Sequence, residues 1–180
     1  MNVCVFGAAS AAIDEKYIVA VEELCKALGQ RGHGLVFGGG ATGVMGAAAR
    51  GFRSGGGKIT GVIPRFFADQ GVENLYTECD NVIYTYDLSE RKNIMISNSN
   101  AFIVGPGGVG TYDEFFEILT LKNLGRHNKP IIIFNVDGFY DPVVQMVVNA
   151  SEAKFIKPEV LDMIEVFDEP NKLIEYLENS

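Results

Sequence analysis

Residues 101–114 read AFIVGPGGVGTYDE, and the kind of fold can be inferred from this stretch first. Its first four residues, Ala101–Val104, are apolar throughout, which is typical of a strand buried on both faces of a sheet. A helical pattern is expected over residues 111–124, and only four glycines, a proline and a valine separate the two elements. A buried strand that passes through a short glycine-rich loop into a helix is the repeating unit of α/β proteins with parallel sheets.

The rest of the chain repeats this alternation. Strands alternating with helices predict a mostly parallel sheet with helices on both of its faces. No linker or repeat divides the chain, so a single domain over residues 1–180 is expected. Residues 66–80 are the longest stretch without a regular pattern and a candidate lid or wall of a site. Further strands are expected at residues 3–6, 35–37, 58–62, 81–84, 130–134 and 164–167, and further helices at residues 15–30, 44–54, 89–99, 140–150 and 170–178.

Composition excludes several functional classes. The formal net charge of −8 disfavours polymeric nucleic acid as a partner. No apolar run approaches the length of a membrane span, and the N-terminal residues resemble a first strand and not a signal peptide. The three cysteines include no C-x-x-C pair, which disfavours a disulfide framework and a zinc site. We therefore expect a cytoplasmic protein without a metal, in which Cys4 and Cys25 are core thiols.

Two glycine loops follow expected strands. Residues 38–46 read GGGATGVMG and residues 105–110 read GPGGVG, and both satisfy G-x-G-x-x-G. Such loops aim backbone N–H groups at one point beside a helix N-terminus, and this arrangement binds anions. The acidic residue that would hold the ribose of NAD about 20 positions later is missing after the first loop. After the second loop, Asp137 lies too far along the chain, and no Walker A motif is present. The pattern indicates the phosphate of a mononucleotide or sugar phosphate.

The spacing of Thr111 and Glu114 matches a capping box, in which the threonine caps a helix and the glutamate reaches back to it. A purely structural role would account for this pair. The same hydroxyl and N–H groups could equally hold a phosphate, with Glu114 at the mouth of the site. Because Asp113 and Glu114 are neighbours, they should point about 100° apart on a helix, and only one is expected to face a ligand.

A second helix start carries an unusual pair of cations. Asp87 or Ser89 is the expected N-cap, which places Arg91 and Lys92 in the first turn. The helix dipole disfavours positive charge there. A bound phosphate would account for the pair, and arginine suits it best because its fork donates two parallel hydrogen bonds.

Together these motifs resemble those of the LOG family, the cytokinin riboside 5′-monophosphate phosphoribohydrolases, which were often mislabelled lysine decarboxylases. Residues 106–114 match P-G-G-x-G-T-x-x-E, residues 90–92 match E-R-K, and residues 38–46 match G-G-G-x-x-G-[LV]-M-G. The likeness extends over most of the chain. It implies a Rossmann-like α/β sandwich, a homodimer with sites near the interface, and no metal or organic cofactor. The implied reaction is hydrolysis of the N-glycosidic bond of a nucleoside 5′-monophosphate to free base and ribose 5-phosphate.

The resemblance also implies roles for individual residues. Arg91 and Glu114 match the catalytic arginine and glutamate of the family, and a carboxylate beside C1′ would stabilise an oxocarbenium-like transition state. Departures from the family pattern at Ala8, Ala9, Leu88 and Asp113 concern the selectivity for the base and its N6 substituent. The expected substrate-binding residues are Ser10, Gly39, Gly40, Lys92, Gly107, Gly108, Val109, Gly110, Thr111 and Thr120.

Three other functions remain open. Proteins of related fold carry molybdenum cofactor without turning it over, but Arg91 and Glu114 favour an enzyme. An NAD(P) oxidoreductase is disfavoured by the missing ribose acid. A pyridoxal phosphate decarboxylase is disfavoured because no lysine stands in a recognisable cofactor site.

Overall fold

The computed structural model describes residues 1–71 and 74–180 and contains one seven-stranded sheet in the order β4-β3-β2-β1-β5-β6-β7. Every neighbouring pair of strands is parallel, which confirms the predicted α/β class. The interior strands β5 and β6 are buried along their whole length, as their uninterrupted apolar runs predict. The strands are β1 (Asn2–Phe6), β2 (Gly34–Phe37), β3 (Ile59–Pro64), β4 (Asn81–Thr85), β5 (Ala101–Val104), β6 (Ile131–Phe134) and β7 (Glu165–Phe167).

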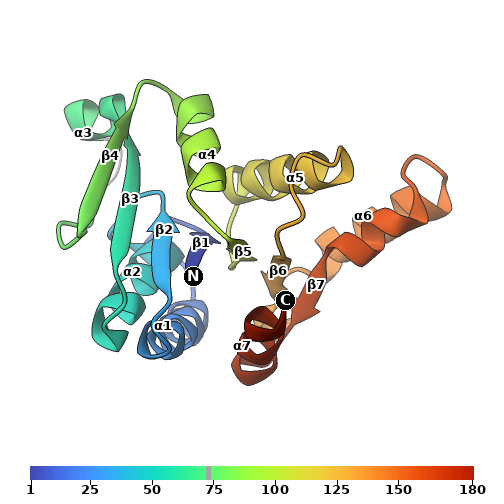
Figure 1. Cartoon of the computed structure of the whole chain (residues 1–180), viewed down its shortest axis with the longest axis horizontal. Coiled ribbons are helices and arrows are strands. Elements are labelled where there is room, and N and C mark those ends of the chain that lie inside the picture. Colours follow the sequence, from blue (N-terminus) through green and yellow to red (C-terminus); the bar gives the residue numbers. More distant parts are fainter. Residues whose placement is uncertain (72–73) are drawn as a thin grey trace.

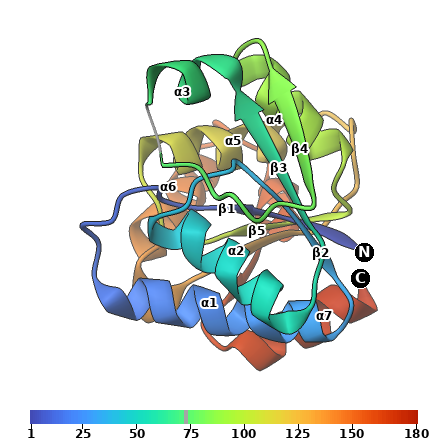
Figure 2. The same cartoon turned by 90° about the vertical axis from the view of Figure 1, so that its left-hand side faces the viewer.

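Helices cover both faces of the sheet and make a three-layer sandwich (Figure 1). The lower layer contains α1 (Glu15–Gln30), α2 (Gly43–Gly55) and α7 (Pro170–Asn179), and α1 and α2 lie side by side in the perpendicular view of Figure 2. The upper layer contains α4 (Leu88–Ser97), α5 (Val109–Asn123) and α6 (Asp141–Glu152). Each layer packs on its own hydrophobic cluster. The remaining elements are α3 (Arg65–Gln70) and the 3-10 turns η1 (Val136–Gly138) and η2 (Pro158–Met163).

The strand order places a topological switch point between β1 and β5. From β1 the chain builds β2, β3 and β4 on one side and then crosses back to build β5, β6 and β7 on the other. Loops leaving the carboxyl ends of β1 and β5 therefore diverge, and ligands of open α/β sheets bind in the crevice between such loops. The second glycine loop leaves β5 at this point.

The start of α5 differs from the prediction. Gly108 is the N-cap and the helix begins at Val109, so Thr111 is its third residue and makes no cap. The predicted capping box is therefore wrong. Glycine is an acceptable N-cap, so the chain turns into the helix earlier than the threonine. The Thr111 side chain is buried against the backbone of Gly107, where an added Cβ would lie 2.1 Å from Oγ1.

The expected irregular stretch over residues 66–80 is partly regular. Its first part belongs to α3, while residues 72–73 lie outside the described part of the chain. Beyond them, the Ala41 amide donates to the Asn74 carbonyl at 2.7 Å, and the Tyr76 amide donates to the Gly39 carbonyl at 2.8 Å. Residues 74–76 are thus held as a wall against the first glycine loop.

Candidate active site

A pocket of about 310 Å³ opens at the switch point. Its walls come from the loop after β1, the first turns of α5 and one side chain each from α2 and α4. The sequence therefore builds it from segments far apart along the chain, as the position of the switch point requires. The lining residues are Gly7, Ala8, Ala9, Ser10, Met45, Arg91, Gly108, Val109, Gly110, Thr111 and Glu114.

The N-terminus of α5 forms one end of the pocket. The first N–H groups of a helix have no acceptor within the helix, and the helix dipole makes this end electropositive. At Gly108 and Gly110 an added Cβ would meet no atom within 4 Å, so the backbone is open to the pocket. This end of the pocket suits a phosphate.

Hydrogen bonds fix the preceding loop from three sides. The Gly105 amide donates to the Phe6 carbonyl at 2.9 Å, and the Ala8 amide donates to the Pro106 carbonyl at 3.1 Å. From behind, the Tyr140 hydroxyl donates to the Gly105 carbonyl at 2.7 Å. Tyr140 is fully buried, and burial raises the pKa of its hydroxyl well above the ordinary value, so it stays a neutral donor. Sequence reasoning missed this tyrosine, because its partner is a backbone atom 35 residues earlier.

Arg91 reaches the pocket from α4 and is buried. Its Nη2 donates to the Gly38 carbonyl at 2.8 Å and its Nε donates to the Val62 carbonyl at 3.2 Å. The guanidinium carbon lies 5.3 Å from the centre of the Phe67 ring. These contacts hold the guanidinium at the carboxyl ends of β2 and β3. A guanidinium has five N–H donors, so it can keep these two bonds and still contact a ligand.

Glu114 lies one turn into α5 and lines the same pocket as Arg91. The pKa of the Cys4 thiol is raised mainly by burial, and the negative charge of Glu114 raises it further. Glu114 therefore lies toward the sheet. Its neighbour Asp113 points outward, with 61% of its side chain exposed. The two acids therefore point in different directions, as expected for neighbours on a helix, and only Glu114 lines the pocket.

Two predicted substrate-binding side chains lie outside this pocket. Lys92 Nζ lies 2.8 Å from Asp113 Oδ2 and 2.6 Å from Glu117 Oε2, between α4 and α5. Thr120 lies two turns beyond the pocket, at clefts beside Phe116. Gly107 lines an adjoining apolar cleft and not the pocket itself.

The first glycine loop supports the site from outside. At the N-terminus of α2, the Met45 amide donates to the Ala8 carbonyl at 3.1 Å, and the Thr42 hydroxyl donates to the Ala9 carbonyl at 2.6 Å. The loop after β1 therefore occupies the place that a second phosphate would need. Gly39 and Gly40 do not line the pocket.

The backbone conformation explains Gly39. It has φ of +86°, and an added Cβ would lie 2.5 Å from Ile63 Cγ1. Gly40 forms an isolated antiparallel bridge with Leu75. Both glycines thus serve packing. Of the predicted substrate-binding residues that precede Arg91 in the described part of the chain, only Ser10 lines the pocket.

Sequence reasoning also did not assign Gly7 and Met45 to the site. An added Cβ at Gly7 would lie 2.2 Å from Val44 Cγ1, so the β1 loop can approach α2 only with glycine there. The position of Gly7 at the carboxyl end of β1 was the signal that could have found it. Among the described residues, no group of three or more His, Cys, Asp or Glu side chains could hold a metal ion, and no helix is long and apolar enough to cross a membrane.

Comparison with known proteins gives concordant matches. Residues 45–177 match the model of a protein family described as "Possible lysine decarboxylase". The chain is 37% identical over 177 residues to a probable cytokinin riboside 5′-monophosphate phosphoribohydrolase, LOGL2, of Oryza sativa subsp. japonica, covering 98% of this chain and 72% of the relative. It is 36% identical over 178 residues to the cytokinin riboside 5′-monophosphate phosphoribohydrolase LOG5 of Arabidopsis thaliana, covering 98% and 77% respectively.

Solved structures with the same fold include molybdenum cofactor proteins. The carrier protein of Chlamydomonas reinhardtii superposes with a TM-score of 0.75 at 24% identity, covering 99% of this chain and 96% of the carrier. The cofactor-binding protein of Rippkaea orientalis superposes with a TM-score of 0.69 at 22% identity, covering 99% and 94%. At this identity the likeness shows the Rossmann-like fold alone.

Proposed function

The chain belongs to the LOG family, which the description "Possible lysine decarboxylase" covers, and on this premise we propose that it hydrolyses the N-glycosidic bond of an adenosine 5′-monophosphate, with or without an N6 substituent. The products are the free base and ribose 5-phosphate. The observation that carries the proposal is that Arg91 and Glu114 line one pocket with the N-terminus of α5. An anion site, a carboxylate and a cation thus surround one space of about 310 Å³.

The substrate is held first by its phosphate. In this proposal the N–H groups of Gly108, Val109 and Gly110 bind the 5′-phosphate, with Thr111 completing the turn. Since Glu114 follows Gly110 by four residues, about one turn of the helix, the ribose then lies beside the carboxylate. Binding energy from the phosphate is spent on placing C1′, and a nucleoside without phosphate loses this orientation.

The chemistry then falls to Glu114 and Arg91. As the C1′–N bond breaks, its electron pair leaves with the base and C1′ gains positive charge, which the Glu114 carboxylate stabilises. Water adds to C1′ and gives its proton to Glu114, while a proton from solvent reaches the departing base. Arg91 positions the substrate and balances the charge of the leaving base.

Purified protein incubated with AMP and with N6-isopentenyl-AMP tests the proposal. We expect free base and ribose 5-phosphate in equal amounts from at least one nucleotide, and a much slower reaction of the corresponding nucleoside. Equal rates on nucleotide and nucleoside would refute the phosphate role of α5. Tight nucleotide binding with no product would instead favour the alternative function, a carrier of a phosphorylated ligand such as molybdenum cofactor, for which the fold is the only support.

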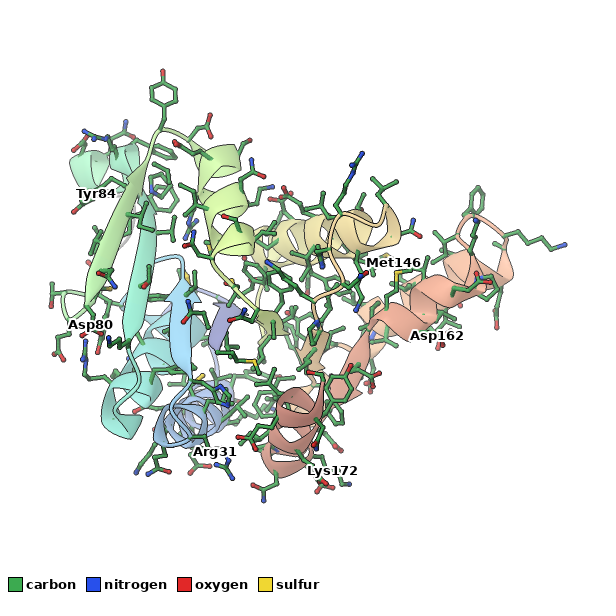
Figure 3. All side chains as sticks on the ribbon, viewed as in Figure 1. Arg31, Asp80, Tyr84, Met146, Asp162 and Lys172 are labelled. Carbon is green, nitrogen blue, oxygen red and sulfur yellow. The ribbon has the colours of Figure 1, made fainter. Side chains whose placement is uncertain are left out.

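We also propose that the protein is a cytoplasmic homodimer with its sites near the interface. An open apolar cleft of about 300 Å³ between α5 and α6 supports a protein contact close to the helix that carries Glu114. Met146, marked on α6 in Figure 3, is 51% exposed at this cleft. Light scattering after gel filtration should give twice the 19.6 kDa chain mass, and a single chain mass would refute the dimer.

A further inference from the structure

Lys92 links the two helices that carry the proposed catalytic residues. It follows Arg91 on α4, and its partner Asp113 precedes Glu114 on α5. The ammonium nitrogen lies 2.8 Å from Asp113 Oδ2 and 2.6 Å from Glu117 Oε2. One cation therefore bridges α4 and α5 one residue away from each side chain that the reaction uses.

The direction of the side chain follows from helix geometry. Successive residues on a helix point about 100° apart, so when Arg91 points to the carboxyl ends of β2 and β3, Lys92 points to α5. Arg91 attaches α4 to the sheet through the Val62 and Gly38 carbonyls. Lys92 attaches the same helix to α5. The two contacts together fix α4 in two directions.

The bridge is partly shielded from water. The side chains of Lys92 and Glu117 are 18% and 27% exposed, whereas Asp113 is 61% exposed. Burial lowers the pKa of Lys92, but the two carboxylates outweigh burial and the net shift is upward, so the ammonium stays charged. Ion pairs in such surroundings are screened less than exposed pairs. Removing the ammonium leaves two carboxylates facing each other without a cation between them.

We propose that Lys92 is a positioning residue that holds α4 against α5 and so sets the spacing of Arg91 and Glu114 across the pocket. It is not a ligand of the substrate phosphate, because it lies outside the pocket and both of its contacts are with carboxylates. This inference rests on the proposed function for its effect on turnover. The bridge itself does not depend on that function.

The test compares four proteins in a double-mutant cycle. Lys92→Met keeps the stem of the side chain and removes its charge, a double variant carries Asp113→Asn and Glu117→Gln, and the triple variant combines them. We expect Lys92→Met to lower kcat roughly 10- to 100-fold with little change in nucleotide KM, because a misplaced catalytic group costs rate more than binding. The double variant should lose a similar factor, and the triple variant no more than either, because all three break the same link.

A phosphate ligand would behave differently. If Lys92 bound phosphate, Lys92→Met would raise the nucleotide KM and weaken inhibition by ribose 5-phosphate, and the double variant would keep wild-type activity. Either result overturns the inference. Lys92→Arg, which can keep both bonds, should restore most of the rate. The matched control is Lys172→Met on α7, whose exposed pair with Glu169 lies away from the site and should leave kcat unchanged.

Free energies of unfolding of the same four proteins separate this inference from the proposed function. A favourable coupling between Lys92 and the two acids is expected even if no nucleotide is cleaved. If the wild-type protein cleaves no nucleotide, the proposed function is refuted, but the inference that Lys92 links α4 to α5 is not. If the changes in the free energy of unfolding are additive, with no coupling between Lys92 and the two acids, the link between α4 and α5 is itself refuted.

Discussion

Substituting Gly38 by alanine should displace Arg91 and abolish most of the activity. An added Cβ at residue 38 would lie 1.8 Å from Arg91 Nη2 and 2.8 Å from its Cζ, far inside the ordinary contact distance of at least 3.4 Å. The added Cβ would also lie 3.2 Å from Met45 Sδ, a close contact that a small shift of the methionine side chain relieves. Gly38 does not have a positive φ, so alanine is acceptable to the backbone itself. The change therefore acts on the guanidinium.

The size of the effect follows from the bonds that the guanidinium must give up. To clear the new methyl group it has to leave the Gly38 carbonyl at 2.8 Å, and its bond to the Val62 carbonyl at 3.2 Å is weakened as well. A hydrogen bond to a charged group contributes about 1.5–3 kcal/mol. A cost of that order in the transition state lowers kcat/KM about 10- to 150-fold.

The assay is kcat/KM on the nucleotide that the wild-type protein cleaves best, with thermal unfolding measured in parallel. Arg91→Ala provides the matched background, because alanine at residue 38 has no guanidinium to displace there. We expect Gly38→Ala to cost no further activity in that background. Activity within twofold of wild type in the single variant, or equal losses in both backgrounds, would refute this explanation of Gly38.

Two further predictions concern buried groups near the site. Tyr140→Phe keeps the ring but removes the donor to the Gly105 carbonyl at 2.7 Å. We expect the free energy of unfolding to fall by about 1–3 kcal/mol and the KM for the nucleotide to rise. An unchanged melting temperature would contradict this. Burial raises the pKa of the Cys4 thiol, so iodoacetamide at pH 8 should modify half-buried Cys79 first and Cys4 only after unfolding, as mass spectrometry of digests can show. Rapid labelling of Cys4 in the folded protein would place it nearer solvent than described.

The parallel sheet could be predicted from the sequence because its signal is local. Runs such as Ala101–Val104 are apolar at every position, and each was followed by a loop and a helical pattern. The unusual position of Arg91 was also visible locally, since a cation near a helix N-terminus needs an explanation. The structure brings Arg91 and Glu114 into one pocket, as the motifs predicted.

Other parts of the site depend on contacts that a sequence pattern does not show. The first glycine loop has the same G-x-G-x-x-G spacing as the second, yet the Ala8 and Ala9 carbonyls occupy its helix N-terminus. Like Arg91, Lys92 lies near the N-terminus of α4, where the helix dipole disfavours a cation. Two carboxylates on α5, those of Asp113 and Glu117, compensate its charge. Thr111 has the spacing of a capping box with Glu114, but the chain enters α5 at Gly108, three residues earlier. In the first two cases a partner distant in sequence decides the role.

In the proposed reaction, Glu114 acts on the glycosidic bond of a nucleotide that α5 holds by its phosphate. The most direct test measures AMP binding and turnover in Glu114→Gln, which preserves the size and hydrogen-bonding capacity of the side chain but removes its charge. We expect a dissociation constant for AMP within a few-fold of wild type. We also expect kcat to fall roughly 10³-fold, because the charge that stabilises the transition state is lost. Turnover of Glu114→Gln close to that of wild type would contradict it.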